Sequence, residues 1–180
     1  MQLELFTTEV YYDLETQRSA GEVGWDNIQL MRLALGVTWS FNEGFLQWDE
    51  SKAPDLIRYL ASFDKIISFN GDGFDSRVLS FYGNVTPMLR KSFDLLVDLK
   101  QRLGHRLSLE SLARATLQVG KSATGLQSLQ WWKEGKVDLI AEYCRQDVKV
   151  LVELVAFGRA NGFVHYLDKN GLLFTVKVQW

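Results

Sequence analysis

The chain has 180 residues, of which 47% are apolar and 23% are charged, and it contains only two prolines. This composition is that of a folded protein and excludes a disordered chain, and the length suits one domain with a sizeable core. No apolar run approaches the ~20 residues of a membrane helix, and no signal peptide opens the sequence, so we expect a cytoplasmic protein without a membrane partner. Cys144 is the only cysteine, which excludes an internal disulfide and a cysteine-rich zinc site.

The formal net charge is −2. A module that holds nucleic acid by electrostatics alone is usually basic, so the charge balance speaks against that class. It fits an enzyme whose acidic site holds divalent cations, because the metals then supply the positive charge that faces a phosphate.

Strands dominate the first third of the chain. Residues 8–12 are rich in β-branched and aromatic side chains and end at Asp13. Residues 31–40 and 45–48 are two further strand candidates, joined by a turn-like Asn-Glu-Gly. Pro54 then opens a predicted helix with a single apolar face. That face consists of Leu56, Ile57, Leu60 and Phe63.

A short apolar strand is predicted over residues 65–69, and a helix is predicted to begin at about Phe74 after a glycine-rich break. Further helices are expected over residues 95–103, from the N-cap Ser108 through residue 117, and over residues 126–133.

The longest predicted helix spans residues 137–160 and stops near Gly162. Asn170-Gly171 then separates two alternating segments, which predicts a β-hairpin over about residues 163–180. Strands first, mixed elements next and a long helix last predict an α/β fold with parallel and antiparallel strand pairs. No repeat or linker divides the chain, so residues 1–180 are expected to form one domain.

The first candidate functional motif is Asp13-Leu14-Glu15. On a strand, residues i and i+2 point to the same face, so both carboxylates project together with Cα atoms about 6–7 Å apart. They would repel each other unless a hard divalent cation bound between them. The alternative is a strand end with solvated acids.

The second motif is the segment from Asn70 to Asp75, which follows an apolar strand and contains two glycines. Asp75 falls at the start of the next helix and at the carboxyl end of the strand, where open α/β sheets bind ligands. The alternative is that Asp75 or Asp72 only caps the helix. The glycines do not form a Walker-type phosphate loop, because no Gly-Lys-Ser/Thr follows.

The third motif is Tyr143-x-x-x-Asp147 in the long helix. Four residues at 3.6 per turn place both side chains within about 40° of each other on one face. The same stripe carries the predicted buried seam of Ile140, Cys144, Val148, Leu151, Leu154 and Val155. An acid within such a seam costs several kcal/mol unless it is paired, either with a metal or with a buried arginine.

In combination, these three motifs resemble those of the DnaQ-like 3′–5′ exonucleases, the DEDD superfamily, over roughly residues 8–158. The family's metal ligands map onto Asp13, Glu15, Asp75 and Asp147. The family divides on whether a His stands five positions before the last acid or a Tyr stands four before it. Glu142 and Tyr143 occupy those positions, so the sequence resembles the tyrosine branch, DEDDy.

The resemblance implies a ribonuclease-H-like mixed sheet flanked by helices, followed here by the C-terminal hairpin. It also implies two Mg²⁺ or Mn²⁺ ions. Asp13, Glu15 and Asp147 would hold one ion, Asp13 would bridge to the second, and Asp75 would act on the second through water. Tyr143 would orient the attacking water rather than act as a base, since a phenol has a pKa near 10. The expected reaction is stepwise hydrolysis from the 3′ end of single-stranded DNA or RNA, releasing nucleoside 5′-monophosphates.

Three residues are weaker candidates for substrate binding: Asn70, Phe74 and Lys121. Other polar and aromatic residues are expected to have structural or surface roles. These are His105, His165, Trp131 and Trp132, with Cys144 as a small buried hydrophobe and Asp94 and Asp98 as helix-dipole or solvated acids.

Other functions fit the same acids. One is a catalytically inactive ribonuclease-H-like module that binds nucleic acid or a partner protein, and another is a metal hydrolase of small phosphate esters. A further alternative is a nuclease domain taken from, or acting beside, a helicase or polymerase; the chain contains no Walker or polymerase-like motif, so any such activity would reside elsewhere. An edge strand ending in Val178 and Trp180 offers a contact for a homodimer.

Overall fold

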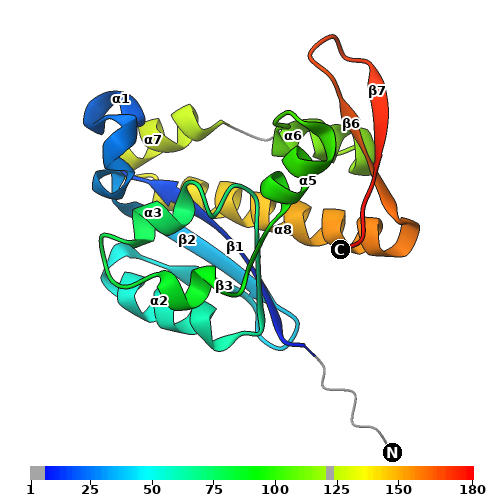
Figure 1. Ribbon diagram of the computed structural model, residues 1–180. Helices are drawn as coiled ribbons and strands as arrows, with labels where there is room; N and C mark the ends of the chain where they lie inside the picture. Colours follow the sequence, from blue (N-terminus) through cyan, green and yellow to red (C-terminus); the bar gives the residue numbers. More distant parts are fainter. Residues whose placement is uncertain (1–6, 121–123) are drawn as a thin grey trace, which may run out of the picture.

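The computed structural model describes residues 7–120 and 124–180, and Figure 1 shows their arrangement. Its centre is a five-stranded sheet in the order β3-β2-β1-β4-β5. The strands are β1 (Glu9–Thr16), β2 (Leu33–Ser40), β3 (Gly44–Trp48), β4 (Lys65–Ser68) and β5 (Ser92–Asp94). Antiparallel pairs join β1 to β2 and β2 to β3, whereas β1–β4 and β4–β5 are parallel. The predicted α/β class with a mixed sheet is therefore confirmed.

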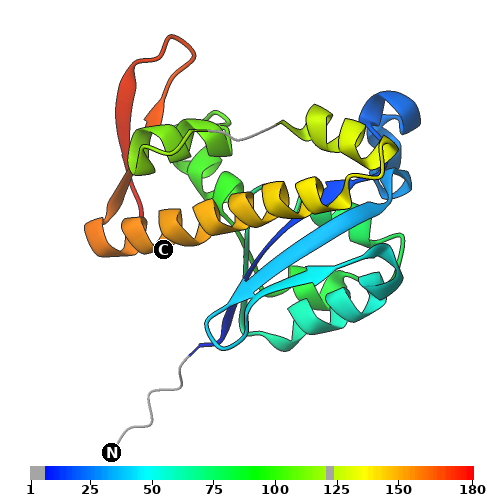
Figure 2. The same ribbon diagram turned by 180° about the vertical axis from the view of Figure 1, so that it is seen from behind.

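Strand β1 has one helix on each side, which explains its apolar sequence. Val10, Tyr12 and Leu14 point to the face that packs on α2 (Ala53–Ser62). Tyr11 points to the opposite face, which packs on α8 (Val137–Asn161). Figure 2 shows α8 running across this face of the sheet. By strand alternation, Asp13 and Glu15 share the α8 face with Tyr11.

The middle of the chain is helical, as expected. Helix α5 (Leu95–Leu103) ends at Gly104, and α7 (Gly125–Lys133) begins at the N-cap Thr124. The Oγ of Ser108 caps α6 (Leu109–Leu112) by accepting from the Ser111 N–H at 3.1 Å. Residues Ala113–Leu117 form a π-helical turn, so the single helix predicted through residue 117 is in fact an α-helix followed by a wider turn.

Several short elements were not predicted, because they are too short to show a hydrophobic period. They are α1 (Ala20–Val23), the 3₁₀ segments η1 (Trp25–Met31) and η2 (Glu50–Lys52), α4 (Thr86–Leu89) and β5. Because η1 extends to Met31, β2 begins at residue 33 rather than 31. Helix α3 (Asp75–Leu79) begins one residue after Phe74, and β1 continues past Asp13 to Thr16.

The C-terminal hairpin pairs β6 (Phe163–Leu167) with β7 (Leu173–Lys177) as a separate two-stranded sheet, and it projects beside α6 in Figures 1 and 2. The predicted second strand ends earlier than residue 180. Trp180 instead packs on α8 at Gly158, where an added Cβ would lie 2.6 Å from the indole ring. Among the described residues, no helix is long and apolar enough to cross a membrane.

Candidate active site

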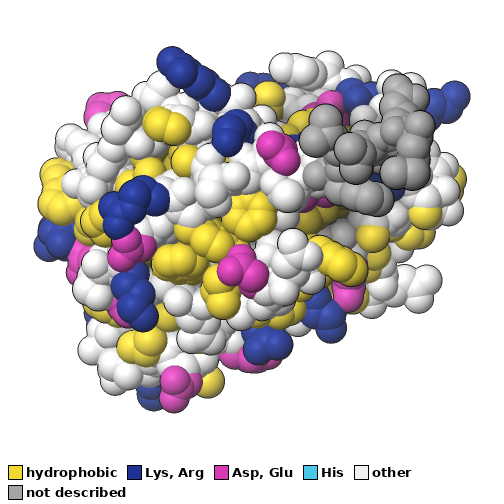
Figure 3. Space-filling view, turned by 90° about the horizontal axis from the view of Figure 1, so that it is seen from below, with side chains coloured by type: hydrophobic (Ala, Val, Ile, Leu, Met, Phe, Trp, Pro, Cys, Tyr) yellow, Lys and Arg dark blue, Asp and Glu magenta, His cyan; other side chains and the backbone are white. Residues whose placement is uncertain are grey.

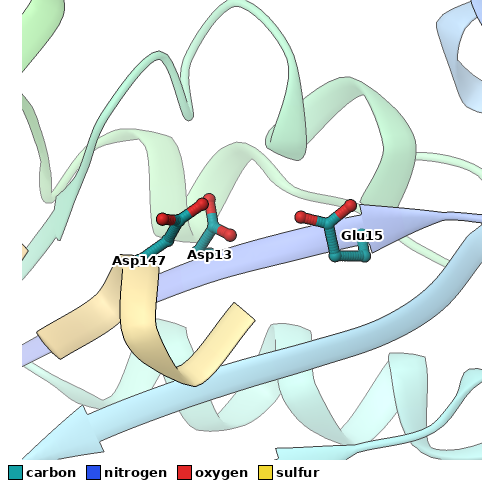
Figure 4. A group of neighbouring side chains, drawn as sticks. All are labelled: Asp13, Glu15 and Asp147. Carbon is teal, nitrogen blue, oxygen red and sulfur yellow. The ribbon is translucent and has the colours of Figure 1, made fainter. Parts of the chain in front are cut away.

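Three carboxylates converge where β1 meets α8. Asp13 and Glu15 extend from β1 and Asp147 from α8, and one oxygen of each lies within 4.8 Å of the others. Figure 4 shows the side chains facing a common space. The alternation of the strand and the turn of the helix, which are local properties, determine the direction in which each carboxylate points. The packing of α8 on the sheet then brings the three carboxylates together.

Cys144 makes a polar contact between α8 and β1, within the apolar cluster that packs the helix on the sheet. Its buried Sγ donates to the backbone oxygen of Asp13 at 3.2 Å and lies 3.5 Å from the Asp13 Oδ2. Cys144 is therefore a buried hydrophobe, as expected, that also makes polar contacts. Asp147 lies three residues further along the helix, and its carboxylate is beside that of Asp13.

Asp75 joins the site from the start of α3, and only 4% of its surface is exposed. The loop before it lies close against β4, because a Cβ on Gly71 would stand 2.2 Å from the Ser68 Oγ. Asn70 takes a positive φ of 66°, which asparagine tolerates better than most residues. Asp75 is outside the group of three carboxylates, yet its charge is the second-largest cause of the raised pKa of Asp13.

The electrostatics of the site oppose full ionisation. Burial, followed by repulsion from Asp75, Asp147 and Glu15, raises the pKa of Asp13 well above its usual range. Burial is also the main reason that the pKa of Asp75 rises to about 7. A divalent cation would reverse both effects, because it neutralises the carboxylates that repel one another.

Tyr143 lies one helical turn before Asp147 and is buried. Burial first, and then the nearby charges of Asp147, Glu15 and Asp13, raise the pKa of its phenol, to which a hydrogen bond with Asp147 also contributes. Trp131 from α7 meets the Tyr143 ring edge-on with centroids 6.5 Å apart. Trp131 and Trp132 both pack against the core under α8, which agrees with the structural role expected for them.

One cavity of about 740 Å³ unites these groups. Its lining includes all five residues predicted to be catalytic, together with Asn70 and Phe74. Lys121 lies outside the described residues. Four further lining residues carried no signal of a functional role in the sequence, since an isolated arginine or a single exposed apolar residue matches no motif. They are Arg18, Trp25, Arg106 and Leu126.

Asp94 stands at the start of a helix as expected, as the N-cap of α5, but it is not solvated. It is buried, and its carboxylate accepts four backbone N–H groups, those of Asn70, Asp72, Leu96 and Val97. It therefore ties the loop that carries Asp75 to the start of α5. Asp98 pairs with Arg102 and accepts from the Trp180 indole. The two histidines do not line the cavity: His105 contacts the Leu103 oxygen and His165 the Thr175 hydroxyl.

The fold and the family define the class of this protein. Residues 10–157 match the family described as the RNase_H superfamily, and the chain belongs to that superfamily.

Among solved structures, the chain is similar to the family B DNA polymerase from the hyperthermophilic archaeon Pyrobaculum calidifontis. The TM-score is 0.63 and the identity 14%, and the match covers 84% of this chain but only 24% of the polymerase chain. This likeness shows a shared fold. No curated protein matches the sequence.

Proposed function

We propose that the protein is a metal-dependent 3′–5′ exonuclease of the DEDDy branch that acts on single-stranded DNA or RNA. The observation that carries the proposal is the convergence of Asp13, Glu15 and Asp147, with Asp75 and Tyr143 on the same cavity wall. These are the positions that the sequence motifs single out, and they come from three separate parts of the fold, β1, α3 and α8.

The donor set suits Mg²⁺ or Mn²⁺. All the converging side chains are carboxylates, and hard divalent cations prefer oxygen ligands. Burial and repulsion between the carboxylates raise the pKa of Asp13, and a bound cation would counter this repulsion. Two bound ions would activate a water and neutralise the charge that develops on the phosphate and on the leaving 3′ oxygen.

The chain's own residues would orient the reactants. The Tyr143 phenol is protonated at neutral pH, because its ordinary pKa near 10 lies well above neutrality and burial raises it further, so it would position water by a hydrogen bond and not act as a base. Asn70 and Phe74 line the cavity beside Asp75 and are proposed to contact the terminal nucleotide. Trp25 and Leu126, which are 69% and 77% exposed at the cavity wall, offer apolar surface to a base.

The test is cleavage of DNA and RNA strands labelled at the 5′ end, with Mg²⁺, with Mn²⁺ and with a chelator. We expect a ladder that shortens from the 3′ end with either metal and no cleavage with the chelator. Asp13→Ala should lose at least about 10³-fold in rate with the fold retained, because metal ligation is lost. Tyr143→Phe should lose about 10- to 100-fold, as partners of metal ligands do.

Glu153→Gln is the matched control, because Glu153 is a glutamate on α8 that pairs with Lys149 and does not line the cavity. Circular dichroism of each variant would show that the fold is retained. Cleavage by Asp13→Ala at the wild-type rate would refute the assignment. Hydrolysis of mononucleotide esters without attack on strands would instead identify a small-molecule phosphatase, and absence of any hydrolysis would identify a binding module.

A further inference from the structure

A second groove, of about 880 Å³, lies next to the active-site cavity, between the start of α6 and the β6–β7 hairpin. Arg106, Leu107 and Ser108 line both hollows, so that the two meet along this short stretch of chain. A mononucleotide would fit within the cavity alone. The adjoining groove would contact only a ligand that is longer than one nucleotide.

Acidic side chains outnumber basic ones in the cavity, whereas basic side chains outnumber acidic ones in the groove. The cavity wall carries four acids and two arginines, whereas three cations and two acids line the groove. The cations are Arg106, Arg114 and Lys169, and all three are exposed. Arg114 and Lys169 have no ion pair within the described part of the chain.

The acid next to Lys169 is already engaged. The Asp168 carboxylate accepts the backbone N–H groups of Asn170 and Leu172, each at 2.8 Å, and so closes the hairpin turn. The face of the molecule seen from below in Figure 3 differs from the groove in its charge. Cationic and anionic side chains are interspersed over it around an apolar centre. The groove is therefore the better place for a polyanion to follow.

Arg106 stands where the two hollows meet and is held there. Its Nη2 donates to the Asn70 Oδ1 at 3.0 Å, and the Asn70 backbone N–H is in turn bound by the buried Asp94 at 2.8 Å. Asn70 is its hydrogen-bond partner among the described residues. Most of the five guanidinium N–H donors thus stay available for a phosphate, which a guanidinium can bind through two hydrogen bonds.

The wall of the groove on the β6 side is held in place by hydrogen bonds within the protein. The Ser111 hydroxyl donates to the Leu167 oxygen and accepts from the Leu167 N–H, at 2.6 and 2.9 Å. The Thr116 hydroxyl makes the same pair of bonds with His165, at 2.8 and 2.9 Å. These four bonds attach the edge of β6 to α6 and the π-helical turn, so the hairpin is positioned without a ligand.

We propose that the substrate is a polynucleotide strand whose backbone leaves the cavity past Arg106 and continues through this groove, with Arg114 and Lys169 on its phosphates. The inference rests on the proposed function, because it assumes that the 3′ end lies at the carboxylates. It assigns the hairpin a role in holding the strand on the 5′ side of the reacting nucleotide, and it selects a strand of several nucleotides over a small phosphate ester.

The test measures binding of labelled oligonucleotides of 3 and 12 nucleotides, as DNA and as RNA, to the protein with Ca²⁺ as the divalent ion. Under these conditions, Arg114→Gln with Lys169→Gln should weaken binding of the 12-mer about 10-fold and leave the 3-mer unchanged. The slope of log K against log salt should become less negative by about 1.4, since each phosphate contact to a single strand contributes about 0.7. Arg106→Gln should weaken binding of both lengths.

Lys52→Gln with Arg58→Gln is the matched control, because it removes two exposed cations at and beside α2, on the other face of the sheet. Equal losses for the 3-mer and the 12-mer, or an unchanged salt slope, would overturn the groove assignment. Wild-type cleavage of the same strands separates the two proposals: cleavage without length-dependent binding refutes only the groove. If neither cleavage nor binding occurs, the proposed function fails as well.

Discussion

At the scale of single residues, Asp75 combines deep burial with an ionisable group. With its pKa near 7 in the fold and near 3.8 in the unfolded chain, the folded protein binds a proton more tightly than the unfolded chain does. Stability therefore falls as pH rises from about 4 through 7, which is the reverse of the usual behaviour of a salt-bridged acid.

Asp75→Asn should remove this penalty, since the amide has no charge to desolvate. Without metal, we expect the variant to be more stable than wild type at pH 8 by a few kcal/mol, and by only about 1 kcal/mol at pH 4.5. Urea unfolding at both pH values measures this. Equal stability of the two proteins at pH 8 would contradict the burial effect.

The raised pKa of Asp13 predicts that metal binding competes with protons. Affinity for Mn²⁺ should rise from pH 6 to pH 8, by up to tenfold per pH unit for each proton displaced. Titration calorimetry at both pH values measures the change, and runs in buffers of different ionisation enthalpy count the protons released. Asp13→Asn is the control and should show weak binding at either pH. Affinity independent of pH would mean that the carboxylates are already ionised.

At the scale of elements, Asp94 links the site loop, β5 and α5 through four backbone N–H groups. Asp94→Ala leaves these buried donors without a partner, so we expect the free energy of unfolding to fall by at least about 2 kcal/mol. Asp138→Ala is the control, an exposed acid in the first turn of α8, with an expected loss of at most about 1 kcal/mol. Similar losses for both would show that the Asp94 bonds contribute little.

The elements also differ in how far the sequence predicts them. Helix α5 has the predicted bounds and α8 differs by one residue, because long amphipathic stretches with a terminal glycine contain their own boundaries. The three-residue β5 was missed, because nothing within it indicates a strand. It forms at Ser92–Asp94 by pairing with β4, which is distant in the sequence.

At the scale of the whole molecule, a net charge of −2 and an acidic cavity should repel nucleic acid until cations are bound. We expect a 12-nucleotide single strand to bind at least about 10-fold more tightly with Ca²⁺ than with a chelator at equal ionic strength. Fluorescence anisotropy measures this, and Asp13→Asn should lose most of the difference. Equal affinity with and without the divalent ion would place the strand away from the carboxylates.

The sequence alone determined which residues were candidates. The spacing of Asp13 and Glu15 on a strand, and of Tyr143 and Asp147 on a helix, is a local property of backbone geometry. Buried seams, caps and the hairpin turn are equally local, so the α/β class followed from them.

Only the tertiary structure decided what those residues meet. The approach of Asp147 to β1, the burial of Asp75 and the junction at Arg106 depend on contacts between segments far apart in the chain. A single sequence contains no record of such contacts, because the energy that specifies them arises from packing across the core and not from any one segment.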